Sequence, residues 1–345
     1  MFKIGIIGCG KIAQVRHIPE YAANPDAELA GYYDFNRERA QQQADMFGGT
    51  VYRTYGEMLS DPSIDAVSIC VANDAHAGIT IEALRAGKHV LCEKPMAMSL
   101  EECEAMVKAA SETGKYLMVG HNQRLAKAHA RARQLVEEGA IGQIVTFRTN
   151  FSHKGPETWS IDPGAGVWFF DKKKAVLGAM ADLGIHKTDL IQFLTGTRVA
   201  EVMAYLGTLD KKDVNGNPIG VDDNAICIYR MENGIMGTMT ASWTCYGEEE
   251  NSTILYGTEG VMKIYCDMAH SIVLERRNGE RIYYDIDSIQ TNANQTRSGV
   301  IDLFMECLVT DTPPEISGEE ALSAMRAVFA AVESAATGTS IKIRR

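Results

Sequence analysis

The sequence predicts an α/β protein of two domains, with a doubly wound parallel sheet in the first third and a mainly antiparallel sheet with helices in the rest. Short β-branched segments alternate with helical patterns up to about residue 121, which is typical of βαβ units. Longer β-rich stretches with Asn-Gly turns follow. The chain has 345 residues, and a single core rarely serves more than about 250–300. We therefore expect domains at 1–121 and 122–345.

Composition and charge exclude several classes of protein. Hydrophobic residues make up 46% and charged residues 23%, the balance of a globular chain. The net charge of -11 disfavours binding to nucleic acid or to an anionic membrane. We find no signal peptide and no apolar run of the roughly 20 residues that a bilayer requires. The eight cysteines form no C-x-x-C pair, so we expect a cytoplasmic protein with reduced thiols, and no metal site is predicted.

In the first domain, the residue pattern predicts strands and helices in alternation. Segments rich in β-branched residues are predicted strands: Lys3–Ile7, Glu28–Tyr33, Ala66–Val71, His89–Cys92 and Tyr116–Val119. Apolar residues at spacings of three and four predict helices: Arg37–Phe47, Ile79–Ala86 and Leu100–Thr113. Ser99 with Glu102 forms a capping box, and Gly87 and Gly114 mark helix ends.

In the second domain, two Asn-Gly turns predict antiparallel hairpins. Asn233-Gly234 should join Asp223–Met231 to Ile235–Cys245, and Asn278-Gly279 should join Ile272–Arg276 to Arg281–Asp285. Apolar periodicity predicts helices at Leu125–Glu138, Gly178–Thr195, Val300–Thr310 and Gly318–Ala336.

A glycine motif follows the first predicted strand. Gly8-Cys9-Gly10-Lys11-Ile12-Ala13 has the form G-x-G-x-x-A and opens a helical segment, which is typical of a Rossmann dinucleotide site. Asp34 ends the second strand about 20 residues on, where a carboxylate accepts hydrogen bonds from the adenosine ribose. A tight turn without a ligand is the alternative. Asp34 would repel a 2′-phosphate and so favours NAD, whereas Arg37 and Arg39 leave NADP open. The predicted cofactor contacts here are Gly8, Gly10, Lys11, Ile12, Ala13, Asp34 and Arg39.

Further cofactor contacts are predicted where the next two strands end, at the carboxyl edge of the sheet. Val71-Ala72-Asn73 and His76 follow one strand, and His76 fits the start of a helix better than a catalytic role. Glu93-Lys94-Pro95 follows the other, which places the Lys94 ammonium where the nicotinamide would lie. A surface salt bridge between Lys94 and Glu93 is the alternative. The predicted contacts are Val71, Ala72, Asn73, His76, Glu93 and Lys94.

Together, Gly8-x-Gly10-x-x-Ala13, Asp34, Glu93-Lys94-Pro95 and Asp182-x-x-x-His186 resemble the Gfo/Idh/MocA family, which includes glucose-fructose oxidoreductase and inositol dehydrogenase. The resemblance covers essentially the whole chain. It implies a Rossmann domain and a C-terminal α/β domain with an open, mainly antiparallel sheet, through which a homodimer or homotetramer would form. It implies Lys94, Asp182 and His186 as catalytic residues and places Arg124 beside the substrate. Val71-Ala72 replaces a common Thr-Pro, and Gly178-Ala179-Met180 replaces a run of glycines.

The residue chemistry agrees with these roles. Asp182 and His186 are four apart in a helical pattern and share one face, so His186 can serve as general base while Asp182 orients it or binds a hydroxyl. Lys94 can stabilise alkoxide character on the reacting oxygen. An exposed i,i+4 pair is the alternative for Asp182 and His186. His153, Trp159, Trp168 and Tyr246 are further candidates for binding a sugar ring, with simple packing as the alternative for each.

These observations predict an NAD-dependent dehydrogenase that oxidises a secondary ring hydroxyl of a sugar, inositol or glycoside. The predicted substrate-binding residues are Lys94, Arg124, His153, Trp168, Asp182, His186 and Tyr246. One alternative is a redox-neutral enzyme that uses bound NAD to cleave a glycoside. Another is a non-catalytic regulator that senses NAD or a sugar, against which the retention of Lys94, Asp182 and His186 argues.

Overall fold

The computed structural model describes residues 1–267, 269–289, 291 and 297–344. The chain forms two compact units, Met1–His121 with Gln295–Leu322, and Asn122–Asn294 with Ser323–Arg345. The predicted second domain, 122–345, is therefore too long. Its described residues 297–322 belong to the first unit.

The first unit contains a six-stranded sheet in the order β3-β2-β1-β4-β5-β6, with every neighbouring pair parallel. Its strands are β1 Phe2–Ile7, β2 Ala27–Tyr33, β3 Thr50–Val51, β4 Ala66–Ile69, β5 His89–Cys92 and β6 Leu117–Val119. The four residues of β4 are all buried, as expected for a strand covered on both faces. The doubly wound parallel sheet is confirmed.

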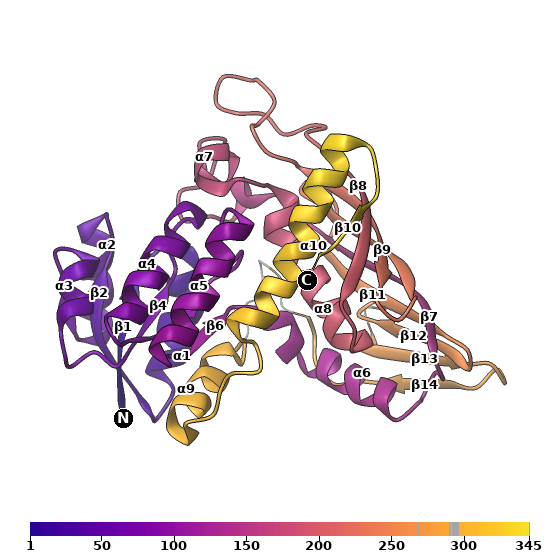
Figure 1. The fold of residues 1–345 in the computed structure, drawn as a ribbon, viewed down its shortest axis with the longest axis horizontal. Helices are drawn as coiled ribbons and strands as arrows, with labels where there is room; N and C mark the ends of the chain where they lie inside the picture. Colours follow the sequence, from indigo (N-terminus) through magenta and orange to yellow (C-terminus); the bar gives the residue numbers. More distant parts are fainter. Residues whose placement is uncertain (268, 290, 292–296, 345) are drawn as a thin grey trace. The chain divides into compact units, whose positions relative to one another are not determined.

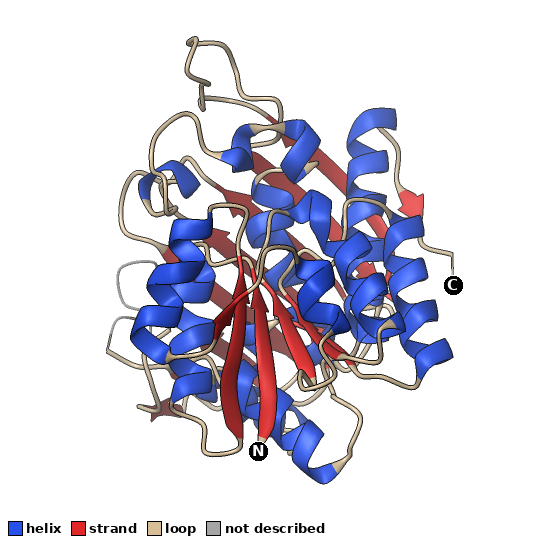
Figure 2. Cartoon of the chain, turned by 90° about the vertical axis from the view of Figure 1, so that its left-hand side faces the viewer, coloured by secondary structure: helices blue, strands red, loops and turns tan. Residues whose placement is uncertain are grey.

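Helices lie on both sides of this sheet (Figure 2). They are the π-helix η1 Ala13–His17, α1 Ile18–Ala22, α2 Arg37–Phe47, α3 Tyr55–Ser60, α4 Asn73–Arg85, α5 Leu100–Thr113 and α9 Val300–Thr310. The α2 and α5 bounds agree with the prediction, and Ser99 caps α5 by accepting from Glu102 N at 3.2 Å. Helix α4 begins at Asn73, whereas the predicted helix began at Ile79. The prediction missed this start because the first turn is polar and lacks apolar periodicity.

Two sets of contacts return the late segment to the first unit. Val119 N donates to Ile316 O at 3.1 Å, so the segment extends the edge of the sheet beside β6. The buried carboxylate of Glu20 in α1 accepts from Ser298 N at 2.7 Å and from its hydroxyl at 2.8 Å. Val119 and Ile316 are almost 200 positions apart, and Glu20 and Ser298 are 278 positions apart. Local sequence patterns do not predict contacts over such separations.

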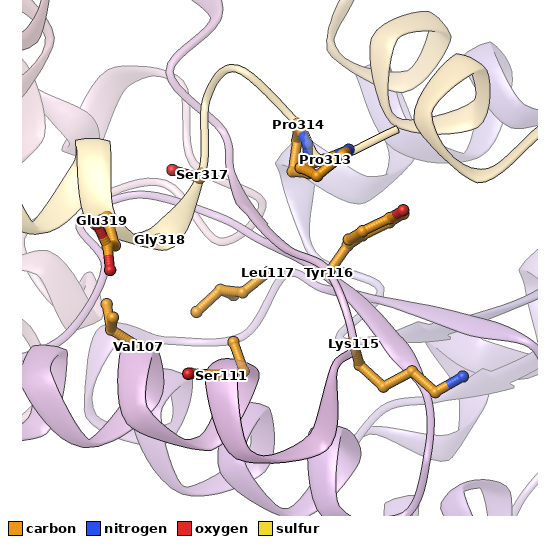
Figure 3. Close-up of a pocket in the computed structure, with 11 residues that line it drawn as sticks. Val107, Ser111, Lys115, Tyr116, Leu117, Pro313, Pro314, Ser317, Gly318 and Glu319 are labelled. Carbon is orange, nitrogen blue, oxygen red and sulfur yellow. The ribbon is translucent and has the colours of Figure 1, made fainter. Parts of the chain in front are cut away.

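A hollow of about 190 Å³ lies in the first unit where α5 ends and β6 begins (Figure 3). Ser111, Tyr116 and Leu117 line one side of it, and Pro313 and Pro314 line another. It therefore adjoins the amino end of β6, whereas dinucleotides lie at the carboxyl ends of parallel strands. We do not assign it to the cofactor.

The second unit contains a nine-stranded sheet in the order β14-β13-β12-β11-β7-β10-β9-β8-β15. Its strands are β7 Ile144–Ser152, β8 Val199–Gly207, β9 Asn224–Met231, β10 Met236–Ser242, β11 Glu250–Gly257, β12 Gly260–Ile264, β13 Ile272–Arg276, β14 Arg281–Tyr284 and β15 Ile341–Lys342. Neighbours are antiparallel except for β7 and β10. Both Asn-Gly hairpins are confirmed, with Gly234 at φ +89° and Gly279 at φ +90° in the turns.

The helical segments of this unit include α6 and α8, which pack on one face of its sheet (Figure 1). They are η2 Asn122–Leu125, α6 Lys127–Glu137, η3 Pro156–Thr158, η4 Trp168–Phe170, α7 Lys172–Ala175, the π-helix η5 Met180–Gly184 and α8 Ile185–Thr195, followed by α10 Gly318–Thr337, which begins in the first unit. In β9, burial alternates strictly, and Ile226 and Ile228 are exposed. The other face of the sheet is thus open in the single chain. Among the described residues, no helix is both long and apolar enough to cross a membrane.

Candidate active site

The two glycines of the first loop have different roles. Gly8 has φ +91°, and a Cβ there would lie 2.6 Å from Cys70 O, so glycine is required for packing against the chain that follows β4. Gly10 has open space where its Cβ would lie. The first helical hydrogen bond runs from Gln14 N to Gly10 O, so the amides of residues 11–13 form the helix N-terminus. Open space beside helix-terminal amides fits a pyrophosphate.

Asp34 connects the end of β2 to this loop. Its Oδ2 accepts from Cys9 N and its Oδ1 from Asn36 N, both at 2.7 Å. A carboxylate has about four acceptor positions, so capacity remains for the ribose hydroxyls of a dinucleotide. Burial and the charge of Asp34 raise the pKa of Cys9 to about 12, and the charge of Arg39 opposes them. Both charged residues therefore lie near the glycine loop.

Glu93 has hydrogen-bond partners within the first unit, and its predicted cofactor contact stays a prediction. Its buried carboxylate lies 2.9 Å from His17 Nε2 and accepts from Lys94 N at 3.1 Å. Burial raises the pKa of Glu93, but the hydrogen bond and charge of His17 outweigh it and lower the pKa to about 2. His17 Nδ1 lies 3.2 Å from Ser68 Oγ. Glu93 thus ties η1 to the end of β5 and fixes the backbone of Lys94.

His76 likewise holds the backbone. It is 1% exposed, with Nδ1 2.8 Å from Pro95 O and Nε2 3.1 Å from Val71 O, and burial lowers its pKa. Both ring nitrogens of His76 thus face backbone carbonyls, and its predicted cofactor contact stays a prediction. Lys94 is half-buried between a buried Glu93 and a cis peptide bond to Pro95. Ala72 is at the N-cap position of α4 without a side-chain capping bond, and Asn73 is buried in the first turn.

Asp182 and His186 are both buried, at 5% and 7% exposure, so the exposed-pair alternative is wrong. Asp182 lies in the π-helix η5 and His186 in the first turn of α8, in place of the single α-helix predicted. Trp243 Nε1 donates to Asp182 Oδ2 at 3.1 Å. Sequence analysis missed Trp243, because it follows β10 and is 61 residues from Asp182.

His153 lies near the same carboxylate oxygen. Gly155 N donates to His153 Nδ1 at 2.9 Å, so in the neutral ring the proton is on Nε2. Nε2 lies 3.8 Å from Asp182 Oδ2, and the ring meets Phe151 edge-on at 5.9 Å. Phe151 also lies 6.2 Å from the His186 ring. The structure therefore brings His153 and His186 to the same aromatic ring, and His153 close to Asp182.

Arg124 forms a buried ion pair with Asp189. Its Nε and Nη2 donate to Asp189 Oδ2 and Oδ1 at 2.7 and 2.6 Å, and both side chains are buried. This fork matches the planar guanidinium to the planar carboxylate. Arg124 thus fixes η2 to α8, one turn beyond His186, and its expected place beside a substrate stays a prediction. Asp189 follows His186 by three residues in the same helical pattern, and this spacing was the sequence signal for a partner of Arg124.

The remaining aromatic candidates belong to two groups. Trp168 stacks on Phe169 with ring centroids 3.9 Å apart, and Trp159 meets the same ring edge-on at 5.5 Å. Phe169 lies 6.4 Å from Trp243, so this group adjoins the Asp182 partner. Tyr246 is exposed, and its hydroxyl donates to Asp210 in the loop after β8.

Comparison with known proteins places the chain in a class of oxidoreductases. Residues 2–121 match the family model described as "Oxidoreductase family, NAD-binding Rossmann fold", and residues 129–263 match the GFO/IDH/MocA C-terminal domain. The chain therefore belongs to the Gfo/Idh/MocA family, and its first unit is an NAD-binding Rossmann domain.

Individual relatives extend over most of the chain. Levoglucosan dehydrogenase from Pseudarthrobacter phenanthrenivorans is 34% identical over 74% of this chain and 72% of its own length. Myo-inositol 2-dehydrogenase from Thermotoga maritima is 25% identical over 99% of this chain and 98% of its own. A levoglucosan dehydrogenase solved with NADH and levoglucosan superposes with a TM-score of 0.87 at 27% identity, covering 99% of each chain.

A buried lysine follows His186 directly. Lys187 is fully buried, its Nζ donates to Thr253 Oγ1 at 3.3 Å, and that oxygen lies 2.8 Å from Thr149 Oγ1. Burial lowers the pKa of Lys187 to about 7, although nearby acidic side chains oppose the shift. Below about pH 7 the buried side chain of Lys187 is charged, and this buried charge lowers the free energy of unfolding.

Lys187→Met is expected to stabilise the protein most at pH 7 and below. Folded Lys187 loses its proton near pH 7, whereas the unfolded chain holds it up to about pH 10.5, so the wild-type free energy of unfolding rises with pH across this window. The advantage of the variant should shrink by about 1.4 kcal/mol per pH unit there. Urea unfolding at a series of pH values measures this, with the exposed Lys108→Met as the control. Parallel pH profiles for wild type and Lys187→Met would contradict the buried charge.

Proposed function

We propose that this enzyme oxidises a secondary ring hydroxyl of a sugar, inositol or glycoside. The observation that carries the proposal is the buried Asp182, which is held by the Trp243 indole four residues before His186. A buried carboxylate with a nearby imidazole suits proton removal from an alcohol. The names of the relatives support the substrate class, since they include levoglucosan, inositol and glucose 6-phosphate dehydrogenases.

Each residue has a distinct role in the proposed mechanism. His186 takes the hydroxyl proton, because imidazole is the side chain suited to proton transfer near neutrality. Asp182, oriented by Trp243 and His153, binds a neighbouring hydroxyl or orients His186. Lys94, with its backbone held by Glu93, stabilises the alkoxide as it forms. NAD, when bound at the glycine loop and Asp34, would supply the hydride acceptor, and the product of the oxidation would be a ketone.

Two other functions are weighed against this one. A redox-neutral enzyme would use the same residues for a temporary oxidation and then cleave a glycoside. A sensor would need NAD and sugar binding but no general base, and the internally braced Asp182 beside His186 favours an enzyme.

The direct test is NADH absorbance when the protein meets NAD and a panel of inositols, aldoses, sugar acids and glycosides. Mass spectrometry of the same samples identifies the products. A substrate-dependent rise in NADH supports the dehydrogenase. A changed glycoside without NADH would favour the redox-neutral reaction, and NAD binding without turnover would favour the sensor.

Lys94→Ala and His186→Ala are each expected to lower kcat by at least about 100-fold, because each removes a group that acts on the reacting hydroxyl. NADH affinity, followed by fluorescence titration, should stay within a few-fold of the wild type. Lys108→Ala, on the exposed face of α5, and His270→Ala, on the loop before β13, are the matched controls. Normal turnover by either test variant would refute its catalytic role.

Asp34→Ser is expected to relax the preference for NAD over NADP by more than about tenfold, since it removes a negative charge from the position of a 2′-phosphate. The loss of the Cys9 N contact should weaken both cofactors, so the readout is the ratio of NADH and NADPH dissociation constants. Asp45→Ser, on the exposed face of α2, is the control. An unchanged ratio removes Asp34 from this role.

We also propose a homodimer or homotetramer formed through the open sheet face. Ile226 and Ile228 of β9 and Tyr205 of β8 are each more than half exposed there, with Tyr205 opposite Ile226. Contiguous exposed apolar side chains are typical of an association surface.

The eight free cysteines, six of them buried, support a cytoplasmic location, where thiols stay reduced.

Ile228→Glu is expected to dissociate the oligomer, because it would place a carboxylate in the apolar centre of this face. Sedimentation velocity measures the change in mass. Val309→Glu, at an equally exposed apolar position on α9, should leave the mass unchanged. A wild-type protein that sediments as a monomer would itself rule out the proposed assembly.

A further inference from the structure

Asp222, just before β9, holds three consecutive amides at the start of the segment that carries Asp182. Its Oδ1 accepts from Gly178 N at 2.8 Å and its Oδ2 from Met180 N at 2.7 Å. Its backbone carbonyl accepts from Ala179 N at 2.8 Å. Asp222 is 8% exposed, so these bonds are shielded from water. One residue therefore fixes both the position and the direction of the chain where η5 begins.

The approach of the two segments is close enough to require glycine. A Cβ at Gly178 would lie 1.8 Å from Asp222 O and 2.9 Å from a methyl group of Val221. Asp182 N then donates to Gly178 O at 2.9 Å, which is the first turn of the helical segment. The backbone of Asp182 is thus connected to Asp222 through a single residue.

A second route from the same strand end reaches the Asp182 side chain. Trp243 N donates to the carbonyl of Asp223 at 2.8 Å, and the Trp243 indole donates to Asp182 Oδ2 at 3.1 Å. The Asp223 carboxylate is occupied elsewhere, by the amides of residues 209–211. Asp182 is therefore held at its backbone through Asp222 and at its carboxylate through Trp243.

We propose that Asp222 is a positioning residue for the oxidation, in that its carboxylate sets the placement of Asp182 and, through the same helical segment, of His186. This inference rests on the proposed function. Nothing in the geometry places Asp222 on a substrate, because its two oxygens face the backbone amides. Burial raises the pKa of Asp222 to about 6 although those amides oppose the shift, so its carboxyl is mostly ionised at neutral pH.

Asp222→Asn tests the role with little change of shape. The asparagine side chain offers one oxygen and one NH2 group. At one of the two contacts, the NH2 group would therefore face a backbone N–H, and two donors cannot form a hydrogen bond. We expect kcat to fall about 10- to 100-fold, because small misplacements of reacting groups have effects of this size. The NADH dissociation constant should stay within about threefold, since the glycine loop and Asp34 lie in the first unit and are unchanged. Asp222→Ala should lower kcat further.

Two control variants separate positioning from general loss of stability. Asp213→Asn alters a carboxylate that also accepts two backbone amides, those of Asn215 and Asn217, in an exposed loop. Glu20→Gln alters a buried carboxylate of the first unit that accepts an amide and a hydroxyl of Ser298. Thermal unfolding should show Glu20→Gln and Asp222→Asn both destabilised. A kcat that falls in proportion to stability in both variants would reduce Asp222 to a structural residue and overturn the proposal.

Hydrogen exchange gives a readout that does not require a substrate. Peptides covering residues 177–186 should exchange roughly 5- to 30-fold faster in Asp222→Asn than in wild type, as expected for a local loss of one or two hydrogen bonds. Peptides of the first unit should not change. Unchanged exchange at 177–186 refutes the anchoring whether or not a substrate is found. Faster exchange in a protein that oxidises nothing in the panel supports the anchoring and counts against the proposed function alone.

Discussion

The hydrogen bond from a backbone amide to a buried or half-buried carboxylate is the interaction on which the functional parts of this protein depend. Asp34 fixes the glycine loop through Cys9 N, Glu93 fixes the Lys94 backbone, and Asp222 fixes the start of η5. In each case a charged acceptor satisfies amides that would otherwise lie unpaired at a strand end or helix start. The loops are therefore held by directional contacts, which gives the groups they carry a defined geometry.

Several side chains that sequence analysis assigned to ligand binding also have partners within the protein. Arg124 is committed to Asp189, Glu93 to His17, and His76 to two backbone carbonyls. Burial explains this, because a charged or polar group removed from water requires partners within the protein. These candidate site residues are therefore held by internal contacts. This pattern is expected of a site whose geometry is set before the substrate arrives.

Local patterns carried most of the predictions that the structure and the comparisons confirm. The G-x-G-x-x-A motif, the Asn-Gly turns and the Ser99 cap each depend on a few adjacent residues, so a short stretch of sequence defines them. The π-helix at 180–184 was not predicted, because its apolar spacing resembles that of an α-helix. The early start of α4 was missed because its first turn is polar and shows no apolar periodicity.

The sequence by itself determined the two-domain α/β class, the family and the identity of Lys94, Asp182 and His186 as candidates, because motif spacing and residue type are local properties. Only the tertiary structure decided which side chains brace them. Trp243 reaches Asp182 across 61 positions, Asp222 reaches Gly178 across 44, and Ser298 returns to Glu20 across 278. Such pairings follow from strand order and packing, which place distant residues side by side and leave no periodic trace in the chain.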